Sequence, residues 1–233
     1  RWRRRKLFIN FWYAALRSDQ LTDQPVRVRM LGQNFVLFRD TAGKAHCLSN
    51  VCVHRGGSLA GGKVRGDRVE CPYHGWQFDG AGQCTRIPSL GAAAKIPARA
   101  RVDAYPVEER YGLVHAFLGD LPVAERPGIM PIPEYGQPGW HAQIDEYQNT
   151  ADYRRTVENG LDPAHNEFVH PTHGFKGINR ELYSVRDYEV TDYAQGWGMW
   201  FLHRFSSPKL EDKTWDEART RGGDLYAGSG THG

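Results

Sequence analysis

Two short cysteine–histidine segments constrain this chain more than any other feature. They are Cys52-Val-His54 and Cys71-Pro-Tyr-His74, and 16 residues separate them. Two thiolates and two imidazoles that arrive on two loops a hairpin's length apart can converge on one metal centre. Zinc also accepts two Cys and two His in a tetrahedron, although zinc ribbons usually carry a Cys-x2-Cys half-site. Buried structural cysteines with surface histidines, or a disulfide, are the remaining alternatives.

The first half of the chain is predicted to be mainly β. Apolar runs alternate with turn sequences, so strands are expected at 34–38 and 45–48 around the turn 40–44, at 76–78 before the turn 79–82, and at 113–118. Glycine pairs at 56–57 and 61–62 lie between these elements and indicate loops that pass close to another group. An all-β domain is therefore expected over 8–119.

A proline-rich segment separates this half from the next. Five prolines and three glycines fall between Leu121 and Trp140, which predicts a linker over 120–140. Beyond it the sequence predicts a strand at 143–147, a helix at 151–159 with Thr150 as its N-cap, a further helix beginning at Asp162 and Pro163, and sheet over 188–202. A second domain is therefore expected over 141–233.

Composition excludes several classes of protein. Of the 233 residues, 40% are hydrophobic and 12% are aromatic, so the chain has enough apolar material for a folded core. The longest apolar run has six residues, whereas a membrane-spanning helix needs about 20. Five of the first six residues are basic, but the net charge is only +3, which indicates a solvated terminus and no nucleic-acid partner. No signal-peptide pattern follows them, so a cytoplasmic location is expected.

A second set of possible metal ligands lies in the second half, in the pattern Asp162-x2-His165-x4-His170. On a regular helix, five residues place the two histidines about 140° apart, too far around the axis to meet one ion. Pro171 disfavours helical geometry at His170, which lets the last turn depart from the helix. Taken alone, a His-x4-His pair is weak evidence for a metal site.

The two cysteine–histidine segments resemble the loops of a Rieske [2Fe–2S] domain, specifically that of the Rieske non-haem iron oxygenases. The resemblance rests on Cys52-x-His54-Arg-Gly and on Cys71-Pro-Tyr-His74-Gly-Trp. It implies that both cysteines bind one iron of the cluster and both histidines bind the other, and that the centre carries one electron.

Other positions near these loops narrow the resemblance. Respiratory Rieske proteins carry a further cysteine in each loop, joined as a disulfide, whereas this chain has Gly57 and Tyr73 nearby. The oxygenase or ferredoxin type is therefore favoured. Cys47 and Cys84 are expected to be free buried thiols, because nothing marks the chain for export.

The same resemblance gives the second set of residues a role. It implies that His165 and His170 bind a mononuclear Fe(II), and that Asp162 bridges between His165 and the histidine matching His74 in a neighbouring subunit. Asn159 matches a residue close to the iron in the smaller, monooxygenase-type members. A third ligand, an aspartate, is expected beyond the end of this sequence, which would then lack the C-terminal part of the catalytic domain.

The fold implied is α+β, with an N-terminal all-β Rieske domain followed by a partial helix-grip catalytic domain. The implied function is that of a large (alpha), terminal oxygenase subunit of the aromatic-ring-hydroxylating type, which uses O2 to hydroxylate an aromatic or other cyclic substrate. Electrons would come from NAD(P)H through a separate reductase or ferredoxin, and the assembly would be a homotrimer. Two alternatives remain open: an O-demethylase or desaturase of the same family, and a plain Rieske electron-transfer protein that lacks the mononuclear iron.

Overall fold

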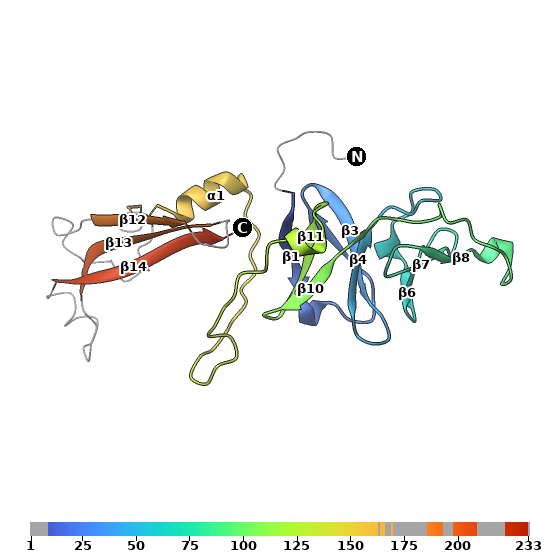
Figure 1. Ribbon diagram of the computed structural model, residues 1–233, viewed down its shortest axis with the longest axis horizontal. Coiled ribbons are helices and arrows are strands. Elements are labelled where there is room, and N and C mark those ends of the chain that lie inside the picture. Colours follow the sequence, from blue (N-terminus) through green and yellow to red (C-terminus); the bar gives the residue numbers. More distant parts are fainter. Residues whose placement is uncertain are drawn as a thin grey trace. The chain divides into compact units, whose positions relative to one another are not determined.

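The computed structural model describes residues 9–162, 164, 165, 169, 186–192, 198–208 and 222–232 (Figure 1). The chain divides into two compact units, Arg1–Ile144 and Asp145–Gly233. The domain bounds expected from the sequence, 8–119 and 141–233 with a linker over 120–140, stay a prediction. Within the described ranges, no helix has the length and apolar character needed to cross a bilayer.

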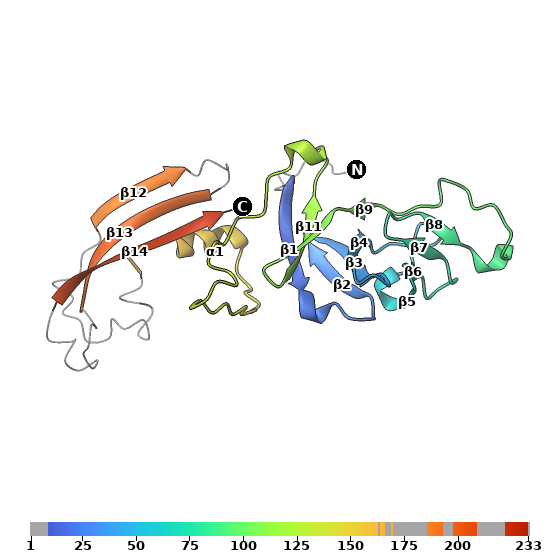
Figure 2. The same cartoon turned by 60° about the horizontal axis from the view of Figure 1, so that its bottom comes forward.

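Apart from four three-residue helical turns, the regular elements described in the first unit are short strands, which confirms its expected β character. In chain order the elements are β1 (Phe11–Arg17), η1 (Ser18–Gln20), β2 (Val26–Met30), β3 (Gln33–Arg39), β4 (Ala45–Ser49), η2 (Leu59–Gly61), β5 (Lys63–Arg65), β6 (Arg68–Glu70), β7 (Gln77–Asp79), β8 (Cys84–Arg86), η3 (Pro88–Leu90), β9 (Ala104–Tyr105), β10 (Val107–Arg110), β11 (Leu113–Leu118) and η4 (Val123–Glu125). Three antiparallel sheets result, with the strand orders β1-β11-β10, β2-β3-β4-β9 and β5-β6-β7-β8 (Figure 2).

Both expected hairpins form, and the same side-chain chemistry closes both turns. β3 pairs with β4, and β7 pairs with β8. Oδ1 of Asp40 accepts hydrogen bonds from the backbone N–H groups of Ala42 and Lys44 at 3.0 and 2.9 Å. Oδ1 of Asp79 closes the β7–β8 turn in the same way. It accepts hydrogen bonds from the backbone N–H groups of the residues two and four positions later in the chain, Ala81 and Gln83. Aspartate favours turns because its side chain can take up these backbone donors.

Strand β3 separates two hydrophobic cores. Val36 and Phe38 pack into the core that contains Cys52 and Cys71. Phe35 and Leu37 pack into a second core, which contains the buried side chains of β11. Successive side chains of a strand point to opposite faces, so a run of four buried apolar residues can serve both cores. The first core therefore supports the two cysteine–histidine loops directly.

The proline-rich segment is part of the first unit and packs against its strands. The indole Nε1 of Trp12 donates a hydrogen bond to the carbonyl of Pro127 at 2.8 Å, and the backbone N–H of Ile132 donates to the hydroxyl of Tyr111 at 2.7 Å. No strand forms at 143–147, so that prediction is wrong. An alternating pattern becomes a strand only where a neighbouring strand takes up its backbone hydrogen bonds.

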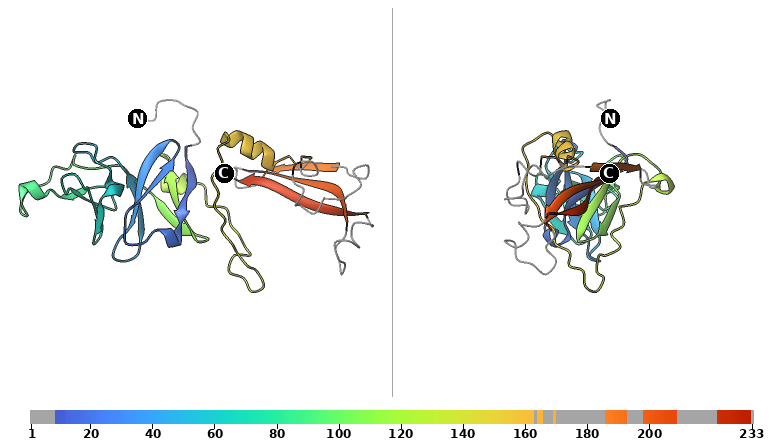
Figure 3. Two further views of the ribbon diagram at one scale, coloured as in Figure 1. Left: turned by 180° about the vertical axis from the view of Figure 1, so that it is seen from behind. Right: turned by 90° about the vertical axis from the view of Figure 1, so that its left-hand side faces the viewer.

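The second unit contains helix α1 (Tyr153–Gly160) and the strands β12 (Arg186–Asp192), β13 (Gly198–Pro208) and β14 (Gly222–His232). The strands form an antiparallel sheet in the order β12-β13-β14 (Figure 3). This sheet confirms the strands expected over 188–202.

Helix α1 begins two residues later than the sequence predicts. Its N-cap is Asp152, whose side chain accepts a hydrogen bond from the backbone N–H of Arg154 at 3.0 Å, so Thr150 as N-cap is wrong. The helix expected to begin at Asp162 and Pro163 lies largely outside the described residues. Oδ1 of Asp162 accepts a hydrogen bond from the backbone N–H of Ala164 at 2.9 Å, as an N-cap side chain does.

Candidate cluster and iron sites

The two cysteine–histidine loops close in the same way. The backbone N–H of Cys52 donates a hydrogen bond to the carbonyl of Gly57 at 2.9 Å. The carbonyl of Cys52 accepts a hydrogen bond from the N–H of Gly56, also at 2.9 Å. Cys71 makes the same two bonds, at 2.8 and 3.0 Å. Gly56 and Gly75 complete these turns with φ values of 73° and 69°, which favour glycine. The two loops therefore present their ligands in related geometry.

The cysteines of the two loops lie together in the core. Cys52 and Cys71 are both buried free thiols. Burial raises the pKa of Cys52 to about 11, and the hydrogen-bonded Cys71 thiol beside it acts in the same direction. The raised pKa favours the protonated thiol. Metal binding has to overcome this preference, because the thiolate is the form that binds metals. Cys47 and Cys84 are also free and buried, as predicted.

Four aromatic rings gather beside the two thiols. The rings of His54 and His74 meet edge to face, with centroids 4.5 Å apart. The indole of Trp76 stacks on His54 at 4.5 Å and 5°, and Tyr73 lies against His74 at 3.9 Å. Burial lowers the pKa of His54, and the neighbouring His74 lowers it further. Both effects favour the neutral imidazole, which is the form that binds metals.

These residues fit a Rieske cluster on two observations. Nδ1 of His54 is buried without a hydrogen-bond partner, although buried polar atoms are almost always paired, and a bond to iron would pair it. A Cβ on Gly57 would lie 2.9 Å from Sγ of Cys71 and 3.3 Å from Cβ of Tyr73, so glycine leaves the space that the loop needs. Each iron of such a cluster takes only two protein ligands. Among the described residues, no group of three or more His, Cys, Asp or Glu side chains is arranged to hold a single metal ion.

The predicted iron-site residues of the second unit come together where α1 ends. Nδ2 of Asn159 lies 3.2 Å from Nε2 of His165, and Oδ2 of Asp162 lies 3.7 Å from Nδ1 of the same ring. The His165 side chain is 17% exposed and that of Asp162 is 52% exposed. The structure thus brings Asn159, Asp162 and His165 together, whereas His170 lies outside the described residues.

Sequence reasoning gave no role to Trp76 and did not anticipate the packing of Gly57 on Cys71. Trp76 follows His74 by two residues and Gly57 follows His54 by three. A large aromatic and a glycine so close to predicted ligands were the available signals. What they do depends on contacts between two loops, which spacing along one loop cannot show.

Comparison with known proteins gives consistent matches. Residues 11–106 match the family described as "Rieske [2Fe-2S] domain". A 4beta-methylsterol monooxygenase of Methylococcus capsulatus is 39% identical over 165 residues, covering 69% of this chain and 44% of the relative. The phenoxybenzoate dioxygenase subunit alpha of Ectopseudomonas oleovorans is 35% identical over 198 residues, covering 78% of this chain and 48% of the relative.

Among solved structures, Pseudomonas putida CBB5 NdmA with caffeine is similar, with a TM-score of 0.72 and 26% identity. The match covers 86% of this chain and 57% of that one. The chain spans less than half the length of the curated relatives that it matches.

Proposed function

The chain belongs to the Rieske non-haem iron oxygenases, and from this premise we propose that it is part of the alpha subunit of a terminal oxygenase. The observation that carries the proposal is the presence of two separate ligand sets, one in each unit. Cys52, His54, Cys71 and His74 lie together in the first unit, and Asn159, Asp162 and His165 lie together in the second. A plain electron carrier has no use for the second set.

When bound, the [2Fe–2S] cluster supplies one-electron transfer and a mononuclear Fe(II) supplies dioxygen activation. In this proposal Cys52 and Cys71 hold one iron of the cluster, and His54 and His74 hold the other. The stacked indole of Trp76 fixes the plane of the His54 ring and keeps water from one of its faces. His165 and His170 would hold the mononuclear iron.

Asp162 is suited to connect two metal sites. Its Oδ1 is fixed by the N–H of Ala164, and its Oδ2 faces Nδ1 of His165 at 3.7 Å. This contact can orient the imidazole and favour the tautomer that leaves the opposite ring nitrogen for a metal. Because the carboxylate is 52% exposed, it can also accept a hydrogen bond from a group on another subunit. We place His74 of a second copy there, within a homotrimer.

The proposed substrate is a small ring-bearing organic molecule, oxidised with O2 and with electrons that derive from NAD(P)H through a reductase or ferredoxin. Relatives named for a methylsterol and for phenoxybenzoate support a ring-bearing substrate. Desaturation is the second candidate reaction, because a relative of 36% identity from Ciona intestinalis is named cholesterol 7-desaturase.

The test is a comparison of iron and acid-labile sulfide in His165→Ala and in His141→Ala, a matched control at an exposed histidine. Both are purified anaerobically and supplied with Fe(II). We expect His165→Ala to keep its sulfide and to lose about one iron relative to the control. Equal iron in the two variants would refute the second site.

A further inference from the structure

Two buried side-chain amides lie at the base of the two cysteine–histidine loops. Asn50 and Gln77 are each 5% exposed, and they are two of the three polar residues buried in the described part of the chain. Asn50 comes two residues before the predicted ligand Cys52, and Gln77 comes three residues after the predicted ligand His74. Because a buried amide needs hydrogen-bond partners, the partners of these two residues show what each of them holds.

Asn50 joins the two ends of the first loop. Its Nδ2 donates a hydrogen bond to Oγ of Ser58 at 2.9 Å, and its Oδ1 accepts one from the backbone N–H of Ala60 at 2.8 Å. Ser58 directly follows Gly57, whose carbonyl closes the loop, and the backbones of Val51 and Ser58 pair as an antiparallel bridge. One side chain before the loop is therefore bonded to two residues after it. We call Asn50 and Ser58 the first clasp.

A charged pair does the same at the second loop. Nε2 of Gln77 donates a hydrogen bond to Oε2 of Glu70 at 2.7 Å. Glu70 ends β6 directly before the predicted ligand Cys71, and Gln77 begins β7. The two residues face each other in the strand register, so their side chains lie on the same face of the sheet. We call Glu70 and Gln77 the second clasp. Each ligand loop is thus closed at its base by a side-chain hydrogen bond, in addition to its backbone bonds.

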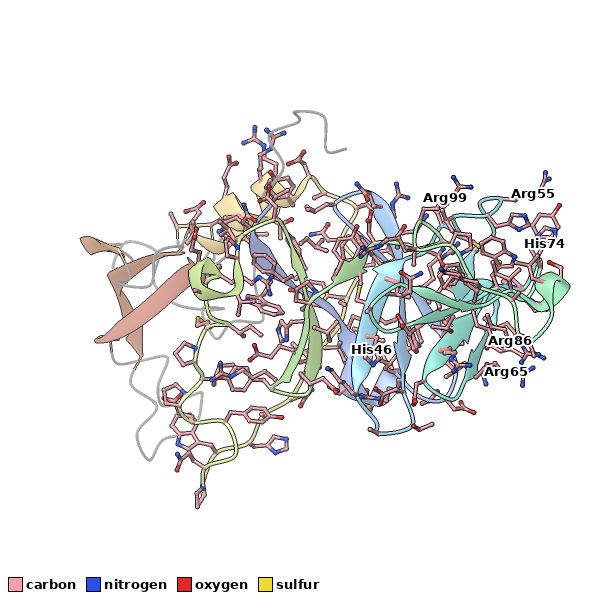
Figure 4. The ribbon with its side chains drawn as sticks, turned by 45° about the vertical axis from the view of Figure 1, so that its right-hand side comes forward. His46, Arg55, Arg65, His74, Arg86 and Arg99 are labelled. Carbon is pink, nitrogen blue, oxygen red and sulfur yellow. The ribbon has the colours of Figure 1, made fainter. Side chains whose placement is uncertain are left out.

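Two arginines support the second clasp. Nε of Arg65 lies 3.5 Å from Oε1 of Glu70, and Nη1 of Arg68 lies 3.5 Å from Oε1 of Gln77. Arg65, on β5, lies at the same end of the first unit as the predicted ligand His74 (Figure 4). Its guanidinium offsets the negative charge that Glu70 brings to the loop. Each side-chain nitrogen and oxygen of the second clasp therefore has a partner.

We propose that the two clasps are positioning elements that preorganise the ligand loops for the electron-carrying cluster, an inference that rests on the proposed function. Each loop supplies one cysteine and one histidine, so a loop that opens would disturb both irons. Ligands that are held in place before the metal binds lose less freedom on binding. Side chains behind metal ligands commonly change metal affinity by about 10- to 100-fold. Opening either clasp should therefore weaken cluster retention, although no clasp residue is a predicted ligand.

The second clasp can be broken and then rebuilt with its two residues exchanged. Gln77→Leu removes the amide and leaves Glu70 without its donor. The double variant Glu70→Gln/Gln77→Glu reverses the hydrogen bond, keeps the net charge and places the new carboxylate beside Arg68. The matched control is Gln83→Leu. It removes a glutamine that bonds to the carbonyl of Ala100 at 3.1 Å, at the turn end of the β7–β8 hairpin and away from the loop.

The assay is the rate at which a strong iron chelator removes the cluster from anaerobically purified protein, with electron paramagnetic resonance after dithionite reduction. We expect Gln77→Leu to lose its cluster about 10- to 100-fold faster than Gln83→Leu, and to show altered g-values because the ligand geometry changes at both irons. The exchanged pair should return both the rate and the g-values toward those of the unaltered chain.

Two results would overturn the proposal. One is an equal rate of cluster loss from Gln77→Leu and Gln83→Leu, and the other is an exchanged pair that loses its cluster as fast as Gln77→Leu. If Gln77→Leu assembles no cluster at all, the exchanged pair still decides, because it has to hold a cluster for the proposal to stand.

Ser58→Ala tests the first clasp separately. It removes the acceptor of Nδ2 of Asn50, so a buried donor loses its partner, whereas Oδ1 keeps its bond to Ala60. Cluster loss should be faster than from the unaltered chain. Loss at the rate of the unaltered chain would overturn the role of the first clasp.

The spectrum of the unaltered chain separates this proposal from the proposed function. If a Rieske spectrum is present after dithionite reduction but the clasp variants behave as the control does, only the clasp proposal fails. If no Rieske spectrum forms in the unaltered chain, the proposed function fails and the clasp proposal fails with it.

Discussion

Gly57→Ala offers a sharp test of how the two loops share the cluster. The carbonyl of Gly57 closes the first loop by accepting the N–H of Cys52 at 2.9 Å. Its φ lies outside the left-handed region, so alanine fits the backbone. The new Cβ would nevertheless lie 2.9 Å from Sγ of Cys71 and 3.3 Å from Cβ of Tyr73. Because neither neighbour is the far end of a flexible side chain, the second loop itself has to move.

The size of the effect follows from this contact. Adding a methyl group to a well-packed site costs about 1–3 kcal/mol. Because about 1.4 kcal/mol changes an equilibrium constant tenfold, cluster retention should weaken roughly 5- to 100-fold. The assay is the loss of cluster absorbance and of acid-labile sulfide in the presence of a strong iron chelator.

The neighbouring glycine supplies the control. Gly56 has a φ of 73°, and a Cβ there would meet nothing within 4 Å. Asn tolerates this backbone conformation better than other non-glycine residues, so Gly56→Asn should retain the cluster nearly as well as the unaltered chain. Cluster loss from Gly57→Ala that is no faster than from Gly56→Asn would refute the steric reasoning.

Three further predictions concern other contacts. Trp76→Leu removes the aromatic stack on His54, which is worth about 0.5–1.5 kcal/mol. The cluster should therefore be lost to an iron chelator faster from Trp76→Leu than from Trp76→Phe, which keeps an aromatic ring. Equal rates of loss would count against a stabilising role of the stack. Asp162→Ala should keep both metals but slow the reoxidation of a pre-reduced cluster by O2 in single-turnover stopped flow; unchanged reoxidation would exclude the bridging role. The Arg39 guanidinium lowers the pKa of Glu109, so this pair should stabilise the fold above the carboxyl's ordinary pKa and lose its effect as pH falls through the lowered value. Arg39→Gln should therefore flatten the acid side of the urea-unfolding profile, and an unchanged profile would contradict this.

The sequence predicted those parts of the fold that depend on local chemistry. The turns after β3 and β7 could be predicted because Asp40 and Asp79 each hydrogen-bond to backbone groups within four residues. The strand expected at 143–147 was wrong because a strand depends on a neighbour that local pattern does not specify. The start of α1 was misplaced because Thr150 and Asp152 are both good N-cap residues, and the Arg154 contact decides between them.

The candidate sites also have features that the sequence predicts and features that only the structure reveals. Ligand types and spacing predicted four cluster ligands. The structure brings the two thiols together and the two imidazoles together, and their binding of a cluster stays a prediction. Spacing could not give the stack of Trp76 on His54 or the approach of Gly57 to Cys71, because each of these contacts joins the first loop to the second.

The most direct test of the central claim is the content of iron, acid-labile sulfide and zinc in anaerobically purified protein, with electron paramagnetic resonance after dithionite reduction. Two cysteines and two histidines in the observed arrangement predict about two sulfides per chain and the low average g-value of a histidine-ligated cluster. A mononuclear site predicts about one iron beyond those of the cluster. Stoichiometric zinc without sulfide would contradict the account.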